Sequence, residues 1–186
     1  MENEETIRIA AEFLSDSDGV VAVDLAGAEA LFPTSDYEKL FAHARAEGIP
    51  FTIHAGEAAG PESIRQAVDY GTARIGHGVN CIHDKNLMNI IAEKGITLEL
   101  CPTSNLNTKI VNDIKDYPID KIINNKIKAT INTDNMTVSG TDEASEMKLI
   151  CDTFGYDGNM RRIFVNNAID AAFLSDEMKE KLRGNL

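Results

Sequence analysis

The sequence predicts an α/β fold built on a parallel sheet of about five βα units. Short apolar runs rich in β-branched residues recur along the chain, and each ends in Gly, Pro, Asp or Asn, where strands give way to loops. Segments with the apolar spacing of helices lie between these runs. Strands on near-continuous apolar runs that alternate with helices are typical of right-handed βαβ units, whose parallel sheets are buried on both faces.

The elements follow from this pattern in chain order. Pro61 suits the first turn of a helix, and Gly71 and Gly95 suit helix ends. The expected strands are 20–25 (VVAVDL), 51–56 (FTIHAG), 73–78 (ARIGHG), 97–102 (TLELCP) and 128–134 (KATINTD). The expected helices are 6–16, 36–48, 61–71, 84–95, 141–155, 159–175 and 176–184. No linker interrupts them, so we expect one domain over 1–186.

Length and composition limit the classes of protein to which the chain can belong. A closed (β/α)8 barrel usually needs about 250 residues, so the 186 residues here are too few for all eight units. With 30 acidic and 18 basic side chains the net charge is −12, which disfavours nucleic acid and anionic membranes as partners. The three cysteines form no CxxC pair, which favours a reducing compartment. The acidic N-terminus does not resemble a signal peptide, so we expect a cytoplasmic protein.

The polar residues that could do chemistry gather at the carboxyl ends of the expected strands. In a parallel α/β sheet these ends lie on one side, where ligands bind. Motifs for a P-loop, a hydrolase nucleophile, a dinucleotide site and a cytidine-deaminase zinc site do not occur. The residues at these ends are Asp24, His54, Glu57, His77, Asp134 and Asn135.

Each of these motifs also has a structural reading. His54 could bind a metal and Glu57 could shuttle protons, or the two could be a hydrogen-bonded histidine and a helix cap. His77 lies between two glycines, which suits either a ligand site or a tight turn. Asp134 could be an oxygen ligand for a metal or could form an Asx turn. We assign no role to His43, which is expected at the surface.

His83 likewise receives no role, and the segment 101–105 (CPTSN) is expected to be a strand-to-loop exit.

Taken in order, the motifs DLAGAE, FTIHAGE, ARIGHG, LELCPTSN and INTDN resemble the adenosine deaminase family of zinc amidohydrolases, over about 20–140. The resemblance implies a (β/α)8 TIM-type barrel. This chain would hold its C-terminal portion, about five βα units, with the N-terminal units absent. It also implies zinc as the cofactor and a purine nucleoside as the substrate. The implied reaction is hydrolytic deamination of adenosine to inosine and ammonia through a zinc-bound hydroxide.

The resemblance also implies a role for six residues. The positions of His54 and Asp134 would bind zinc, and that of Glu57 would donate a proton to the purine ring. His77 would orient the zinc-bound hydroxide. The backbone N–H of Gly27 and the side chain of Asn135 would contact the purine, and an Asn amide can donate to N7 without first being protonated.

The sequence departs from the family pattern in its metal ligands. The HxH pair on the first barrel strand does not occur, so His54 and Asp134 supply two ligands where catalytic zinc takes three or more. Ala28 replaces a usual aspartate, for which we have no physical account. A catalytically inactive purine-binding or assembly module, or a deaminase of another 6-aminopurine, is therefore the alternative. The unpaired sheet edge of such a partial barrel predicts self-association.

Overall fold

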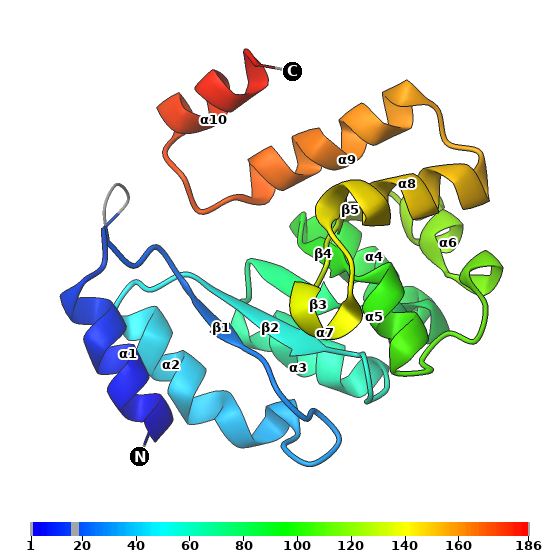
Figure 1. Cartoon of the computed structure of the whole chain (residues 1–186). Helices are drawn as coiled ribbons and strands as arrows, with labels where there is room; N and C mark the ends of the chain where they lie inside the picture. Colours follow the sequence, from blue (N-terminus) through cyan, green and yellow to red (C-terminus); the bar gives the residue numbers. More distant parts are fainter. Residues whose placement is uncertain (1, 16–18, 186) are drawn as a thin grey trace.

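A computed structural model describes residues 2–15 and 19–185, and a five-stranded parallel sheet lies at its centre (Figure 1). The strands pair in the order β1-β2-β3-β4-β5, and every pair is parallel. Their bounds are β1 Val23–Leu25, β2 Phe51–Ala55, β3 Arg74–His77, β4 Thr97–Leu100 and β5 Lys128–Ile131.

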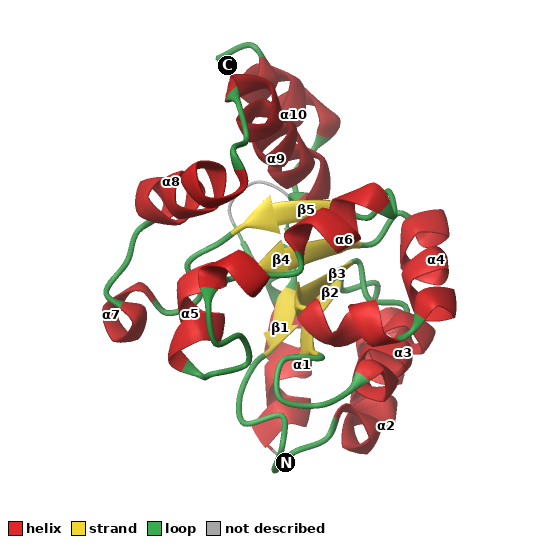
Figure 2. Cartoon of the chain, turned by 90° about the vertical axis from the view of Figure 1, so that its right-hand side faces the viewer, coloured by secondary structure: helices red, strands yellow, loops and turns green. Residues whose placement is uncertain are grey.

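The strand order identifies the sheet as part of a barrel. Right-handed crossovers that always step to the next strand place every connecting helix on the same face of the sheet. Doubly wound sheets reverse their strand order and carry helices on both faces. Here the order never reverses, and Figure 2 shows helices α2, α3 and α4 along one side of the strands. The predicted α/β fold with five parallel strands is therefore confirmed.

The helices begin and end at the residue types that the sequence indicates. Pro61 opens α3, and Gly71 and Gly95 close α3 and α4 in the left-handed conformation. The side chain of Asp84 caps α4 by accepting from the backbone N–H of Leu87. The helices are α1 Glu2–Glu12, α2 Glu38–Ala46, α3 Pro61–Tyr70, α4 Lys85–Lys94, α5 Pro102–Asn107, α6 Ile119–Asn124, α7 Met136–Ser139, α8 Glu143–Phe154, α9 Gly158–Ala171 and α10 Asp176–Arg183, with short 3-10 turns η1 Thr34–Tyr37, η2 Val79–His83 and η3 Ile114–Asp116.

Several boundaries differ from the prediction. The helix expected over 6–16 begins and ends earlier as α1, and Asp16 lies outside the described residues. The segment 101–105, expected to be a loop, leads directly into α5, with Pro102 as its first residue. The prediction also missed α6, because a helix of six residues is too short to display a 3.6-residue period.

The two faces of the sheet differ in polarity, which the near-continuous apolar runs did not reveal. Ile53, Ile75 and Leu98 on the helix-covered face are completely buried. On the other face the guanidinium Nε of Arg74 lies 2.8 Å from the Glu99 carboxylate. A barrel strand points alternate side chains into the barrel interior, so this polar face is the interior side.

The two edges of the sheet also differ. Next to β5, the Asn167 side chain on α9 donates to the backbone carbonyl of Ala129 at 2.9 Å. At the other edge, β1 pairs with β2 as its one partner among the described strands. Self-association through an unpaired edge stays a prediction, and β1 is the edge to which it now applies. Within the described residues, we find no helix with the length and apolar character needed to cross a membrane.

Candidate functional site

His54 lies on the interior face of β2, against β3. The register pairs it with Gly76, and a Cβ at position 76 would lie 2.5 Å from the His54 ring carbon Cδ2. Glycine at this position therefore makes room for the ring of His54. The sequence suggested that the glycines around His77 leave room for a ligand to approach its ring, and in the structure Gly76 makes room for the ring of His54.

Acidic groups surround His54. Its Nε2 lies 3.3 Å from Oδ2 of Asp24, at the carboxyl end of β1. Burial, the largest single influence, lowers the pKa of His54, but the hydrogen bond and charge of Asp24 and the charges of Asp134 and Glu99 together raise that pKa above its ordinary value. The imidazole thus faces a negative environment that favours a cation.

His77 ends β3 in an unusual backbone conformation. Its φ of 61° is left-handed, which is uncommon for a residue with a side chain and frequent at functional sites. The side chain is fully buried, and its ring meets that of His54 edge-on with centroids 5.0 Å apart. Nδ1 is hydrogen-bonded to the Asn105 side chain at 3.0 Å. Burial is the largest cause that lowers the pKa of His77.

Glu57 follows β2 and faces His77. Its Oε2 lies 3.5 Å from Nε2 of His77, and its Oε1 accepts a hydrogen bond from Thr108 at 3.3 Å. The distance to His77 is too long for a good hydrogen bond. The two groups therefore face each other without being bonded.

A buried carboxylate, that of Glu29, holds the loop that carries Glu57. Oε2 of Glu29 accepts from the backbone N–H groups of Glu57, Ala58 and Ala59 at 3.0, 2.8 and 2.9 Å. Oε1 accepts from the N–H of Gly56 at 2.6 Å and from the hydroxyl of Ser63 at 2.5 Å. Five donors thus fix the backbone between β2 and α3, and with it the position of Glu57.

Asp134 lies at the carboxyl end of β5 on the same side of the sheet. Its φ of 56° is left-handed, which Asp tolerates better than most residues. Ser104 on α5 donates to Asp134 Oδ2 at 2.7 Å. Asp134 contributes to the pKa shifts of both His54 and His77, so its charge lies close to both rings.

The other two predicted residues lie at the border of this group. Gly27, with a φ of 149°, lines a pocket of about 50 Å³ together with Glu29 and His54. Asn135 is exposed and uses its side chain to cap α7, accepting from the N–H of Val138 at 3.0 Å. Its hydrogen bond to Val138 turns the Asn135 side-chain oxygen to α7.

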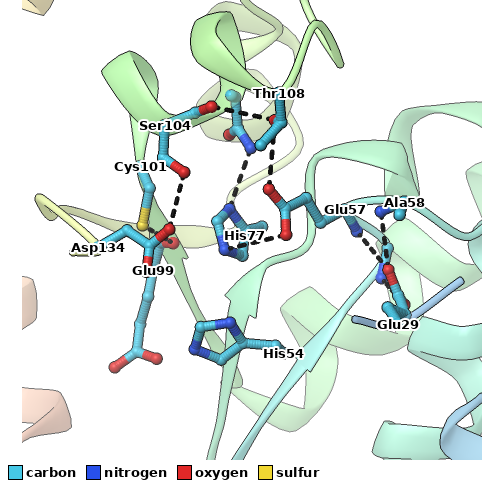
Figure 3. Close-up of polar contacts among 12 residues, drawn as sticks. Glu29, His54, Glu57, Ala58, His77, Glu99, Cys101, Ser104, Thr108 and Asp134 are labelled. Atoms are coloured by element: carbon cyan, nitrogen blue, oxygen red, sulfur yellow. Dashed lines mark hydrogen bonds and ion pairs between the residues drawn. The ribbon is translucent and has the colours of Figure 1, made fainter. Parts of the chain in front are cut away.

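Figure 3 shows His54, Glu57, His77 and Asp134 together, although they come from three strand ends and the loop after β2. The sequence prediction missed the residues that hold them, which are Glu29, Ser104, Asn105 and Tyr117. The motif CPTSN contained two of these, but it was interpreted as ordinary loop chemistry. Glu29 likewise lies in a motif that the sequence analysis quoted, DLAGAE, but nothing in the sequence indicates which loop its carboxylate holds.

The described residues do not by themselves fit a zinc ion. Catalytic zinc takes at least three protein ligands, and no group of three His, Cys, Asp or Glu side chains within 2–15 and 19–185 has a suitable arrangement. His54 and Asp134 are two donors of suitable chemistry, an imidazole nitrogen and a carboxylate oxygen. A complete site would need further donors.

The chain is similar to known proteins over most of its length. The family model described as "Adenosine deaminase" matches residues 1–186. The chain is 45% identical to the adenosine deaminase of Haemophilus ducreyi over 185 residues, which are 99% of this chain and 54% of that protein. It is 41% identical to the adenosine deaminase of Clostridium perfringens over 166 residues, 89% of this chain and 50% of that protein. The chain thus spans about half the length of the curated relatives it matches.

Solved structures give the same result for the fold. The apo N6-methyl-AMP deaminase of Arabidopsis thaliana superposes with a TM-score of 0.87 at 28% identity, covering 98% of this chain and 53% of that one. An amidohydrolase from Burkholderia ambifaria was solved with bound zinc and superposes with a TM-score of 0.88, covering 98% of this chain and 51% of that one. Its sequence identity is 24%, so this similarity concerns the fold alone. The five strands match about half of a deaminase barrel, and the chain belongs to the adenosine deaminase family.

Proposed function

We propose that this chain contributes the proton-donating and purine-contacting part of a site that hydrolyses adenosine to inosine and ammonia. The observation that carries the proposal is the meeting of His54, Glu57, His77 and Asp134 at one side of the sheet (Figure 3). Two imidazoles and two carboxylates from three strand ends and the loop after β2 are the kind of convergence that marks a functional site in a parallel α/β fold. Membership of the family supports the assignment of the reaction.

Hydrolytic deamination of adenosine requires a general acid and a group that stabilises the oxygen atom that adds to C6. A carboxylic acid at Glu57 would protonate N1 of the purine, which makes C6 more open to attack by water. The tetrahedral centre at C6 then loses ammonia, so adenosine and one water give inosine and one ammonia. His77, whose Nε2 lies 3.5 Å from the Glu57 carboxylate, is positioned to contact the oxygen that adds to C6.

The purine edge would lie against the loop after β1. The pocket lined by Gly27 and His54 measures about 50 Å³, far below the ~300 Å³ at which typical ligand pockets begin. The described residues therefore enclose only one edge of a nucleoside. We assign the N–H of Gly27 to that edge and the side chain of Asn135 to another part of the purine. The cap on α7 uses only Oδ1 of Asn135, so its NH₂ group can donate to the ring.

The described residues supply too few ligands to hold the zinc cofactor by themselves. His54 and Asp134 would be two of its ligands, and the remaining donors would come from outside the described residues. The chain spans 54% of the Haemophilus ducreyi enzyme, so the unmatched part of that protein is a practical source of such donors.

The experiment compares the chain with a chimera in which it is joined to the unmatched part of the Haemophilus ducreyi enzyme. Zinc content is measured by atomic absorption, and adenosine conversion by its change in ultraviolet absorbance. We expect stoichiometric zinc and deamination in the chimera, and neither in the chain alone. A chimera that folds and binds zinc but does not convert adenosine would overturn the proposal.

The shortage of metal donors favours a second candidate, a purine-binding or assembly module without turnover. That function predicts that the isolated chain binds inosine in calorimetry when no metal is present. Our proposal predicts no measurable binding under those conditions. A parallel comparison of adenosine, adenine and AMP as substrates of the chimera would rank the 6-aminopurines within the enzymatic proposal.

A further inference from the structure

A chain of three buried polar side chains lies behind His77. The hydroxyl of Tyr117 donates to Oδ1 of Asn105 at 3.0 Å, and the Asn105 amide nitrogen lies 3.0 Å from Nδ1 of His77. Asn105 and His77 are fully buried, and Tyr117 is 2% exposed. Water therefore does not compete for these two hydrogen bonds.

The direction of each hydrogen bond follows from Tyr117. Burial raises the pKa of Tyr117 well above its ordinary value, so the phenol keeps its proton. The phenol donates this single proton to Oδ1 of Asn105 at 3.0 Å.

This contact fixes the Asn105 amide and, through it, the ring of His77. Since Oδ1 faces Tyr117, the amide NH₂ group must face His77. An NH₂ group only donates, so Nδ1 of His77 has to accept and cannot carry a hydrogen. In a neutral imidazole the proton then lies on Nε2.

We propose that Asn105, oriented by Tyr117, is a positioning residue that holds His77 in the tautomer protonated on Nε2. That nitrogen is buried and has no hydrogen-bond partner among the described residues. It lies 3.5 Å from Oε2 of Glu57. His77 therefore presents a hydrogen-bond donor to the site, not a base.

The tautomer itself depends only on the contacts of this chain, whereas its chemical consequence rests on the proposed function. A ring that uses its one lone pair on Asn105 cannot remove a proton from water at Nε2. It can donate to the oxygen that adds to C6 and stabilise charge there. His77 would thus orient and stabilise the attacking oxygen, and its deprotonation would be the task of another group.

Nitrogen NMR of the ¹⁵N-labelled chain tests the tautomer directly. Spectra are recorded in mildly alkaline solution, where imidazoles are neutral, and His77→Gln identifies the signals. We expect Nδ1 of His77 to resonate as an unprotonated nitrogen and Nε2 as a protonated one. Protonation of Nδ1 in the unmodified chain would overturn the inference.

Because free histidine has its own tautomer preference, Asn105→Asp supplies the decisive comparison. A carboxylate only accepts, so it should draw the proton to Nδ1 and exchange the two nitrogen signals of His77. His83 in the same spectra should not change. Tyr117→Phe frees the Asn105 amide to turn, and it should give a mixture of tautomers if Asn105→Asp does not fold. An unchanged pattern in a folded variant, shown by circular dichroism, would refute the proposal.

Kinetics of the chimera separate this inference from the proposed function. We expect Asn105→Asp to lower kcat by more than tenfold with little change in KM. If the chimera folds and binds zinc but has no activity, the proposed function fails and the NMR result stands. If the chimera is active and Asn105→Asp exchanges the tautomer without a loss of kcat, the donor role of His77 is wrong.

Discussion

Replacing Glu29 with glutamine should destabilise the fold far more than its single lost charge suggests. Glu29 is 8% exposed, and its two carboxylate oxygens accept five hydrogen bonds. Glutamine keeps one accepting oxygen. Its NH₂ group must face either Gly56 and Ser63 or the three consecutive N–H groups that begin at Glu57. An amide nitrogen cannot accept from a backbone N–H, although the Ser63 hydroxyl can turn to accept from it.

The magnitude follows from the hydrogen bonds that are lost or weakened. In the less costly orientation of glutamine the hydrogen bond from Gly56 disappears and the other four lose their charged partner. Hydrogen bonds to a charged group contribute about 1.5–3 kcal/mol each, against about 1 kcal/mol for neutral ones. Relaxation of the loop recovers part of this, so we expect a loss of about 3 kcal/mol in unfolding free energy. For a chain of this length that corresponds to a fall in Tm of roughly 6–12 °C.

Urea denaturation followed by circular dichroism measures this loss as a shift in midpoint at constant slope. Glu57→Gln is the matched control, since Glu57 lies in the same loop and its carboxylate accepts one long hydrogen bond, from Thr108. We expect the control to lie within about 0.5 kcal/mol of the unmodified chain. A loss below about 1 kcal/mol for Glu29→Gln would refute the view that this carboxylate holds the loop.

Three further predictions concern other parts of the chain. Gly76→Ala should cost about 1–3 kcal/mol in unfolding free energy, since the new Cβ would overlap the ring of His54. Gly158→Ala is the control and should be neutral, because nothing lies within 4 Å of its new Cβ. Equal urea midpoints for the two variants would show that the overlap at position 76 is relieved elsewhere. The hydrogen bond from the Leu87 N–H is the largest cause that lowers the pKa of Asp84. The ionised Asp84 carboxylate should therefore stabilise the fold above about pH 4, and this stabilisation should be lost as the pH falls through the lowered pKa of Asp84. The difference in unfolding free energy between the chain and Asp84→Asn should therefore narrow in acid, and a constant difference would contradict this. Light scattering should show species heavier than 20.3 kDa if the β1 edge pairs between molecules, and a monodisperse monomer would count against it.

The sequence predicted the sheet well because strands in a parallel sheet leave a strong local pattern. β2 Phe51–Ala55 and β4 Thr97–Leu100 lie within the expected runs, and Pro61 and Gly95 begin and end helices as expected. Short elements left no such pattern, which is why α6 was missed. The polar interior face was also missed, since residues such as Thr52 and Thr130 suit either face of a strand.

The candidate site was only partly predictable for a related reason. The residues at strand ends, such as His54 and Asp134, could be found because parallel topology brings those ends together. The residues that hold them act across long sequence distances: Glu29 holds a loop about 30 positions away, and Asn105 contacts His77 from 28 positions away. Such pairings depend on how loops pack, and no local pattern in one sequence reports them.

The most direct test of the proposed chemistry is the rate of adenosine deamination by the zinc-loaded chimera when Glu57 is replaced with glutamine. A general acid contributes about 10²–10⁴ to the rate, so we expect kcat to fall by at least 10² while zinc content stays the same. His83→Gln, at a residue without an assigned role, should leave kcat unchanged. A Glu57→Gln chimera that deaminates adenosine as fast as the unmodified one would contradict the assignment of the proton donor and, with it, the function proposed for this group of residues.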